Sequence, residues 1–340
     1  MLEQPDIPEE HLRACLEQEY GVSVATLEFL PLGQDIRAGV YRVVSEQGAA
    51  YLLKAKSGSF YELSCLIPRY LNDQGIAAVV APMPTHSQGL WTQIGEWTII
   101  VYPFIEGETT WEPPMTDAQW RAVGAVVRQM HQLAPPIERF PLLRRETFDP
   151  GGYSRAVRNL EAQHIYVEGG SECAQQLRAS WLAHYDMIHS GVSTLEKLSG
   201  VLQTQAGPYV ICHADLHPSN IIRRPQHQVF VIDWDDVMLA PKEHDFIFVG
   251  DAPEPGAQDI APFFQGYGLT EIDWMALTYY LWERVIQDVI EYARQVISPD
   301  DLDETTRIDG IRRFNANLSE WGKANSSLAR AMAHLPALHN

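Results

Sequence analysis

Basic residues are scarce in this 340-residue sequence, which has 25 Lys and Arg against 44 Asp and Glu and contains only five lysines. The formal net charge of −19 repels a phosphate backbone, and no run of Lys or Arg offsets it. We therefore expect no nucleic acid partner. The charge favours a cationic small molecule as partner, although an acidic surface also serves solubility alone.

Cysteine pairs and long apolar runs are also missing. The four cysteines stand far apart and form no CxxC pair, so a zinc ribbon or a thioredoxin-type site is unsupported. The longest apolar stretch, Trp97 to Ile105, is far shorter than the ~20 residues of a membrane helix. The acidic start MLEQPDIPEE lacks the apolar segment of a signal peptide. We expect a soluble protein of the reducing cytoplasm with no membrane partner; the oligomeric state stays open, and a monomer is compatible.

The sequence changes character near residue 103. Before it, strand patterns lie on both sides of one helical pattern over 63–71. The segment FIEGETTWEPP, with Gly and two prolines, is typical of a hinge. After it, helical patterns dominate except for a β-rich piece at 209–236. We expect an α+β fold with a small β-rich lobe over 1–102, a hinge at about 102–107, and a larger, mainly helical lobe over 103–340.

The most informative segment is 209–249. One apolar strand pattern, YVIC, runs into His213-Ala-Asp215-Leu-His217-Pro-Ser-Asn220, and a second, VFVI, runs into Asp233-Trp-Asp235-Asp236. We expect these two strands to form a hairpin around a polar turn, which would bring Asp215, Asn220 and Asp233 together. Hard oxygen ligands of this kind suit Mg²⁺, with phosphate oxygens completing its shell.

A metal hydrolase is an alternative for the same residues. His213, Asp215 and His217 alternate, so in an extended segment all three side chains point the same way and would suit zinc or iron. No other residue clearly completes such a site, and this interpretation leaves Pro218 and the spacing to Asn220 unexplained.

The pattern HxDxxxxN, followed about a dozen residues later by DxD, resembles the catalytic loop and metal-binding segment of kinase-like phosphotransferases. With His-Pro before the asparagine and Asp-Trp after the second strand, it is similar to the aminoglycoside phosphotransferase family. The stretches IDWDDVMLAPKEHD and YYLWERVIQDVIEY resemble the members that act on spectinomycin. The resemblance is strong over 209–250 and moderate over 279–292, and it extends thinly over the whole chain.

This resemblance implies a bilobal protein-kinase-like fold and a Mg²⁺-dependent transfer of the γ-phosphate of ATP or GTP. The acceptor would be a hydroxyl of an aminoglycoside or aminocyclitol antibiotic of the spectinomycin type, with resistance as the result. Asp215 would accept or orient the hydroxyl proton, while Asn220 and Asp233 would hold the metal. His213 would support the loop by hydrogen bonding, and His217 would lie near the phosphates.

The resemblance also implies phosphate-binding groups in the first hundred residues. A lysine on the third strand would contact the phosphates. We choose Lys54, with Lys56, which points the same way, as the fallback. Glu62 would be the glutamate partner of the lysine, unless it only forms a capping box with Ser59.

The expected glycine-rich loop and hinge are less regular. PLGQDIRAG stands in the place of the loop but departs from GxGxxG, and we expect Gly33 to approach the phosphates. Pro103 has no N–H, so Phe104 or Ile105 would supply the backbone donor to adenine.

We expect the acceptor to meet acidic and aromatic residues after the metal site, namely Asp235, Asp236, Tyr279, Trp282 and Asp288. The Trp282 ring would face an ammonium group, although plain core packing of the helix explains the same residues. Only six residues separate Asp233 from Ala240, too few for the activation loop of a protein kinase.

Two other classes remain open. A metabolic kinase of the same superfamily would act on choline, homoserine, methylthioribose or a sugar amine. A nucleotide-binding pseudokinase ranks last, because it would lack one of the catalytic carboxylates, the asparagine or the lysine, and all are present.

Overall fold

The computed structural model describes residues 4–32, 37–109, 112–134, 137–167, 169–205, 207–250, 252, 260–268, 271–297, 304–324 and 326–335. The chain forms two compact units. The first comprises Met1–Arg144, Val210–Leu239 and Pro262–Gly268, and the second comprises Arg145–Tyr209, Ala240–Ala261 and Leu269–Asn340. The lobe boundary expected near residue 102 falls inside the first unit and stays a prediction.

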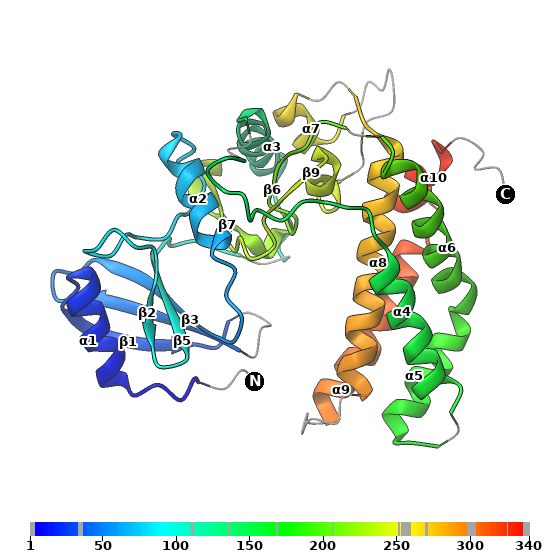
Figure 1. Ribbon diagram of the computed structural model, residues 1–340, viewed down its shortest axis with the longest axis horizontal. Helices are drawn as coiled ribbons and strands as arrows, with labels where there is room; N and C mark the ends of the chain where they lie inside the picture. The colour runs from blue at the N-terminus through cyan, green and yellow to red at the C-terminus, as the bar shows by residue number, and fades with distance from the viewer. Residues whose placement is uncertain are drawn as a thin grey trace. The chain divides into compact units, whose positions relative to one another are not determined.

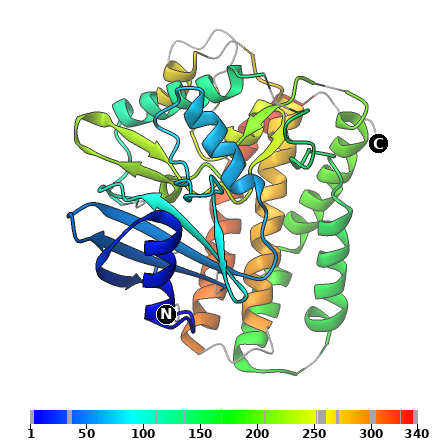
Figure 2. The ribbon, with the colours of Figure 1, turned by 60° about the vertical axis from the view of Figure 1, so that its left-hand side comes forward.

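A five-stranded antiparallel sheet forms the β-rich part of the first unit. Its spatial order is β1-β2-β3-β5-β4, with bounds β1 (Val24–Leu30), β2 (Ala38–Ser45), β3 (Ala50–Ser57), β5 (Trp97–Pro103) and β4 (Thr92–Ile94). Helix α1 (Glu9–Tyr20) lies along one face of this sheet (Figures 1 and 2), where Leu12 and Leu16 join its core. Helix α2 (Leu63–Asp73) places Cys65 against residues of the opposite face.

The alternation of side chains along β3 decides where its lysines point. Leu53 and Ala55 are fully buried in the core that contains α1. Successive residues of a strand face opposite sides, so Lys54 and Lys56 both lie on the other face. Lys54 is paired in register with Ile100 of β5, which belongs to the cluster around Cys65 of α2.

Two helices of the first unit approach each other closely. Helix α3 (Asp117–Gln132) begins with a capping box formed by Thr116 and Gln119, a spacing of Thr and Gln that is typical of a helix start, and it packs against α7 (Pro262–Tyr267). A Cβ atom at Gly124 would lie 2.1 Å from the carbonyl oxygen of Phe263. Only glycine allows the two backbones to come this near.

The segment around the expected active residues contains four short strands. The hairpin pairs β7 (Ile221–Arg223) with β8 (Val229–Val231), while β6 (Val210–Cys212) pairs with β9 (Met238–Ala240). The prediction that YVIC and VFVI form the hairpin was therefore wrong in its first strand. Asn220 stands directly before β7, at the end of the 3₁₀ turn Pro218–Asn220, so the strand that follows the loop takes the hairpin position.

The second unit is built from helices. These are α4 (Gly151–Leu160), a π-helical turn (Glu161–Ile165), α5 (Glu172–Ala183), α6 (Tyr185–Leu202), a 3₁₀ turn (Lys242–Phe246), α8 (Trp274–Ile297), α9 (Glu304–Trp321) and α10 (Ser327–Ala333). The long helix α8 packs against α6 and α9 (Figure 1), and half of its residues are buried. Across the described residues, none of the helices is long and apolar enough to pass through a membrane.

Candidate active site

Asp215 and Asn220 are held together in one loop between β6 and β7. The side-chain Nδ2 of Asn220 donates to the backbone oxygen of Asp215 at 2.9 Å and lies 3.3 Å from its carboxylate oxygen Oδ2. The backbone N–H of Asn220 donates to the carbonyl of His217 at 2.8 Å. Ala214, next to Asp215, has a φ of +69°, a left-handed conformation that is uncommon for a residue with a side chain.

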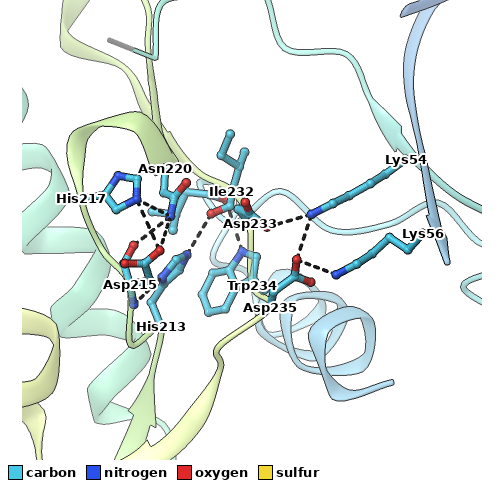
Figure 3. A network of polar contacts seen from close by, with 11 residues as sticks. Lys54, Lys56, His213, Asp215, His217, Asn220, Ile232, Asp233, Trp234 and Asp235 are labelled. Carbon is cyan, nitrogen blue, oxygen red and sulfur yellow. Dashed lines mark hydrogen bonds and ion pairs between the residues drawn. The ribbon is translucent and has the colours of Figure 1, made fainter. Parts of the chain in front are cut away.

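His213 is fully buried and joins this loop to the strand that precedes Asp233. Its Nε2 lies 2.8 Å from the carbonyl oxygen of Ile232, and its Nδ1 lies 3.3 Å from the backbone N–H of Asp215 (Figure 3). A ring nitrogen beside a carbonyl must donate, and one beside an N–H must accept, so the imidazole is neutral with its proton on Nε2. Both nitrogens are therefore occupied by the backbone, and the metal-hydrolase alternative loses its first histidine ligand.

The second carboxylate of the motif, Asp233, also has a left-handed backbone, with φ +62°. It follows Ile232, whose N–H donates to the carbonyl of Asn220 at 3.0 Å. This bond and the His213 contact bring the two halves of the motif together, as the sequence predicts. Left-handed backbone at Ala214, next to Asp215, and at Asp233 itself is an uncommon conformation of the kind that clusters at active sites.

Asn220 and Asp233 fit a magnesium ion by their chemistry. The contacts of the Asn220 amide described above use Nδ2, which leaves Oδ1 as the ligand atom. The Asp233 side chain is 46% exposed and offers carboxylate oxygen. Mg²⁺ takes one or two such groups from the protein and completes its shell with water and phosphate oxygens.

A chain of ion pairs links Asp233 to the two lysines of β3 (Figure 3). Lys54 Nζ lies 2.9 Å from Asp233 Oδ1 and 3.0 Å from Asp235 Oδ2, and Lys56 Nζ lies 2.7 Å from the same Asp235 oxygen. Burial by itself lowers the pKa of Lys54, but the two carboxylates hold it above its ordinary value. Burial likewise raises the pKa of Asp235, yet the two lysines hold it well below the usual range. Lys54 and Asp235 are therefore both charged at neutral pH.

Other predicted residues lie around this network. His217 Nε2 is 3.3 Å from Asp215 Oδ2 and 3.4 Å from Asn220 Nδ2, so it faces the proposed base. Asp236 carries a 3.7 Å ion pair to Arg144, and its pKa is raised by burial and by Asp215 and Asp235.

The residues predicted to contact the nucleotide differ in how well their positions suit that role. Glu62 is exposed and precedes α2 without capping it through its side chain, and the carboxylates bonded to Lys54 are Asp233 and Asp235. Phe104 already donates its N–H to the carbonyl of Ala50 at 3.2 Å, which favours Ile105 as the donor to adenine. Gly33 lies outside the described residues.

The predicted acceptor residues of the second unit all lie on α8. Tyr279 is fully buried, Trp282 is 4% exposed, and Asp288 forms an ion pair with Arg284 at 3.0 Å. Phe148 packs edge-on against the Tyr279 ring at 5.1 Å. Tyr279 and Trp282 are therefore largely enclosed by protein.

Sequence reasoning did not bring together Glu146, His244 and Glu283 of the second unit, whose ligand atoms lie within 4.8 Å of one another. Burial, together with the charge of Glu146, raises the pKa of Glu283 to about 8, against a smaller lowering by a hydrogen bond from Tyr153. Glu283 follows Trp282 directly, so its place on α8 was a signal. Glu146 and His244 are remote in sequence, and no spacing pattern joins them to it.

Comparisons with known proteins agree with this geometry. Residues 28–278 match the phosphotransferase enzyme family, APH. The structure is similar to spectinomycin phosphotransferase APH(9)-Ia in complex with ADP and spectinomycin, with a TM-score of 0.83, 30% identity, and coverage of 97% of this chain and 99% of that chain. Its AMP-bound complex matches with a TM-score of 0.78 and 28% identity, over 96% and 99% of the two chains.

Two further relatives are more distant. An aminoglycoside phosphotransferase from Alicyclobacillus acidocaldarius shares the fold, with a TM-score of 0.64 and 16% identity over 98% of both chains. Protein StrN from Streptomyces griseus is 29% identical over 116 residues, which are 33% of this chain and 34% of StrN, so the match spans about a third of that relative. Together with the site geometry, the family match over residues 28–278 shows that the chain belongs to the phosphotransferase enzyme family and is a kinase-like phosphotransferase with an alcohol group as acceptor.

Proposed function

We propose that this protein transfers the γ-phosphate of ATP or GTP to a hydroxyl of an aminoglycoside or aminocyclitol antibiotic of the spectinomycin type, and so confers resistance. The observation that carries the proposal is the similarity over 97% of the chain to a phosphotransferase whose structure holds ADP and spectinomycin. The four buried cysteines are free thiols, which suits the reducing cytoplasm, where we expect the enzyme to act.

The groups of the first unit divide the chemistry among them. Asp215 would orient the acceptor hydroxyl and take its proton, while the neutral His213 fixes the loop that carries it. Lys54 would neutralise phosphate charge. Mg²⁺, when bound by Asn220 and Asp233, would supply further neutralisation. Phosphoryl transfer depends mainly on positioning and electrostatics, so this small set is sufficient.

The second unit supports a cationic acceptor. Glu146 and Glu283 place two carboxyl groups near one another among the aromatic rings of α8. Burial and then the charge of Glu146 raise the pKa of Glu283, and a positive charge placed beside this pair would offset the repulsion between the two carboxylates. Among the described residues, the buried hydroxyl of Tyr279 and Nδ1 of His244 have no hydrogen-bond partner, and a polar acceptor would satisfy them. Within the second unit, we therefore add this cluster to Tyr279 and Trp282 as proposed acceptor residues.

The test measures Mg²⁺-dependent release of ADP or GDP by purified protein, with ATP and GTP each supplied. The acceptor panel is led by spectinomycin and includes other aminoglycosides, choline, ethanolamine, homoserine and methylthioribose. We expect stimulation by spectinomycin, and none in the Asp215→Asn variant. Stimulation only by a metabolite would refute the antibiotic as acceptor and identify a metabolic kinase. Mg·nucleotide binding without turnover on any acceptor would contradict the proposal as a whole.

A further inference from the structure

We infer that Asp235, held by Lys56, is the positioning residue that sets Lys54 toward the nucleotide phosphates, in place of a glutamate supplied by helix α2. The inference rests on the proposed role of Lys54 in phosphate binding. It assigns to Lys56 and Asp235 the positioning of Lys54, a role that the family motifs named above do not give to either residue.

One carboxylate oxygen is the centre of the arrangement. Oδ2 of Asp235 accepts hydrogen bonds from Lys54 Nζ at 3.0 Å and from Lys56 Nζ at 2.7 Å (Figure 3). The two lysines lie two residues apart on β3, so the strand aims both ammonium groups at the same side of the sheet. The lysine side chains are only 17% and 15% exposed. Asp235, whose side chain is 37% exposed, therefore bridges two lysines that are themselves largely enclosed, and ion pairs to enclosed groups are screened less than pairs between exposed groups.

Helix α2 offers no carboxylate to take this role. Its first turn contains no acidic residue, and its single acidic residue, Asp73, pairs with Arg69. The α2 residue beside Lys54 is Cys65, a fully buried thiol whose pKa burial raises strongly, with smaller effects from Asp235 and Lys54. Glu62 is exposed before the helix begins. The negative charge that pairs with Lys54 therefore comes from Asp235, in the segment that follows Asp233, and not from α2.

The second partner of Lys54, Asp233, has another task. It is one of the two residues that fit the metal, so its carboxylate is shared between the lysine and that ligand. Asp235 is not shared with the metal in this way, because its carboxylate oxygen Oδ2 accepts hydrogen bonds from the two lysines. Lys56 completes the set by fixing the Asp235 carboxylate, and the four side chains together carry no net charge.

Removing the Asp235 charge should leave two ammonium groups facing one neutral amide. We expect Asp235→Asn to weaken Mg·ADP binding and raise the KM for ATP about tenfold or more, with a smaller change in kcat, because a charge-assisted contact of Lys54 is lost. Lys56→Met should raise the same KM severalfold, and Asp235→Glu should restore part of the affinity. Asp73→Asn, at the far end of α2, is the matched control and should leave binding within twofold.

A direct readout separates positioning from a general structural effect. Reductive ¹³C-methylation labels only the five lysines and the chain terminus, and Lys54→Arg identifies the Lys54 resonance. At a fixed neutral pH, the Lys54 resonance should change its chemical shift and broaden in Asp235→Asn, because the ammonium group loses one of its two charged partners and is held less firmly. If Asp235→Asn does not fold, as judged by circular dichroism, Lys56→Met carries the same comparison.

Two outcomes would overturn the inference. One is a Lys54 resonance whose chemical shift and width at neutral pH are the same in Asp235→Asn and in the parent protein. The other is a Glu62→Gln variant that loses more nucleotide affinity than Asp235→Asn, which would return the role to the helix side. Failure of the parent protein to bind Mg·ADP at all would instead contradict the proposed function, so the two results are distinguishable.

Discussion

Replacing Glu283 by glutamine should change how the stability of the protein depends on pH. Burial and the nearby Glu146 raise the pKa of Glu283 from 4.5 to about 8 in the folded protein. The folded state therefore binds a proton that the unfolded chain releases between these two values. The unfolding free energy should fall as pH rises through this window and level off above pH ~8.

The size of the effect follows from the same pKa. Each pH unit within the window corresponds to ~1.4 kcal/mol, so the change from 4.5 to about 8 has an upper bound of ~5 kcal/mol. Solvent reaches part of the Glu283 side chain and reduces this figure, and we expect ~3 kcal/mol. Glutamine has nearly the same shape and does not ionise, so Glu283→Gln should remove this contribution and be the more stable protein at pH 9.

Urea unfolding of both proteins from pH 4.5 to 9 gives the comparison. The difference between the two curves isolates Glu283 from the other titrating groups. Glu291→Gln, at an exposed position of the same helix, is the control and should run parallel to the parent. Glu146→Gln should raise stability at pH 8, because it removes the like charge. Parallel curves for Glu283→Gln and the parent would refute the reasoning.

Three further predictions concern the first unit. Asp215→Asn should lower kcat about a thousandfold and leave the Kd for Mg·ADP within twofold, measured by initial rates and calorimetry; near-normal turnover would contradict its role as base. Asp233→Ala should abolish the Mg²⁺-dependent part of ADP binding, seen as equal affinity with Mg²⁺ and with EDTA, and a retained difference would remove it from the metal site. Gly124→Ala should lower the free energy of unfolding, measured by thermal denaturation, by more than ~2 kcal/mol, because its Cβ would lie 2.1 Å from the Phe263 carbonyl oxygen. Gly200→Ala is the control and should not lower it, because a Cβ there meets open space.

The parts of the fold that follow local periodicity could be predicted from the sequence. Alternation along YLLKAK places the two lysines on one face, and the structure confirms that both reach the same carboxylate. The capping box at Thr116 begins α3 as its residues predict. Both features depend on residues a few positions apart, so the pattern contains all the information that is needed.

Pairing between distant segments was predicted less well. The motif residues Asp215, Asn220 and Asp233 are gathered as expected, yet the strand opposite β8 proved to be β7. Two short apolar runs compete for the same partner, and a three-residue strand has too little pattern to decide between them. The motif residues still lie close together, although the hairpin was predicted with the wrong strand. The hydrogen bonds that join Ile232 to His213 and to Asn220 lie outside the hairpin strands and hold the two segments together.

The partner of Lys54 shows why a family pattern alone can misplace a charge. A family pattern gives only the types and the order of residues along the chain. By that order, Glu62 corresponds to the glutamate that pairs with the strand lysine. A buried ammonium requires a carboxylate within contact distance, whatever segment supplies it. In this chain β3 carries a second lysine, and that lysine holds a second aspartate beside the first. The extra basic residue on the strand and the extra acidic residue after the metal motif are therefore best understood as one electrostatic unit.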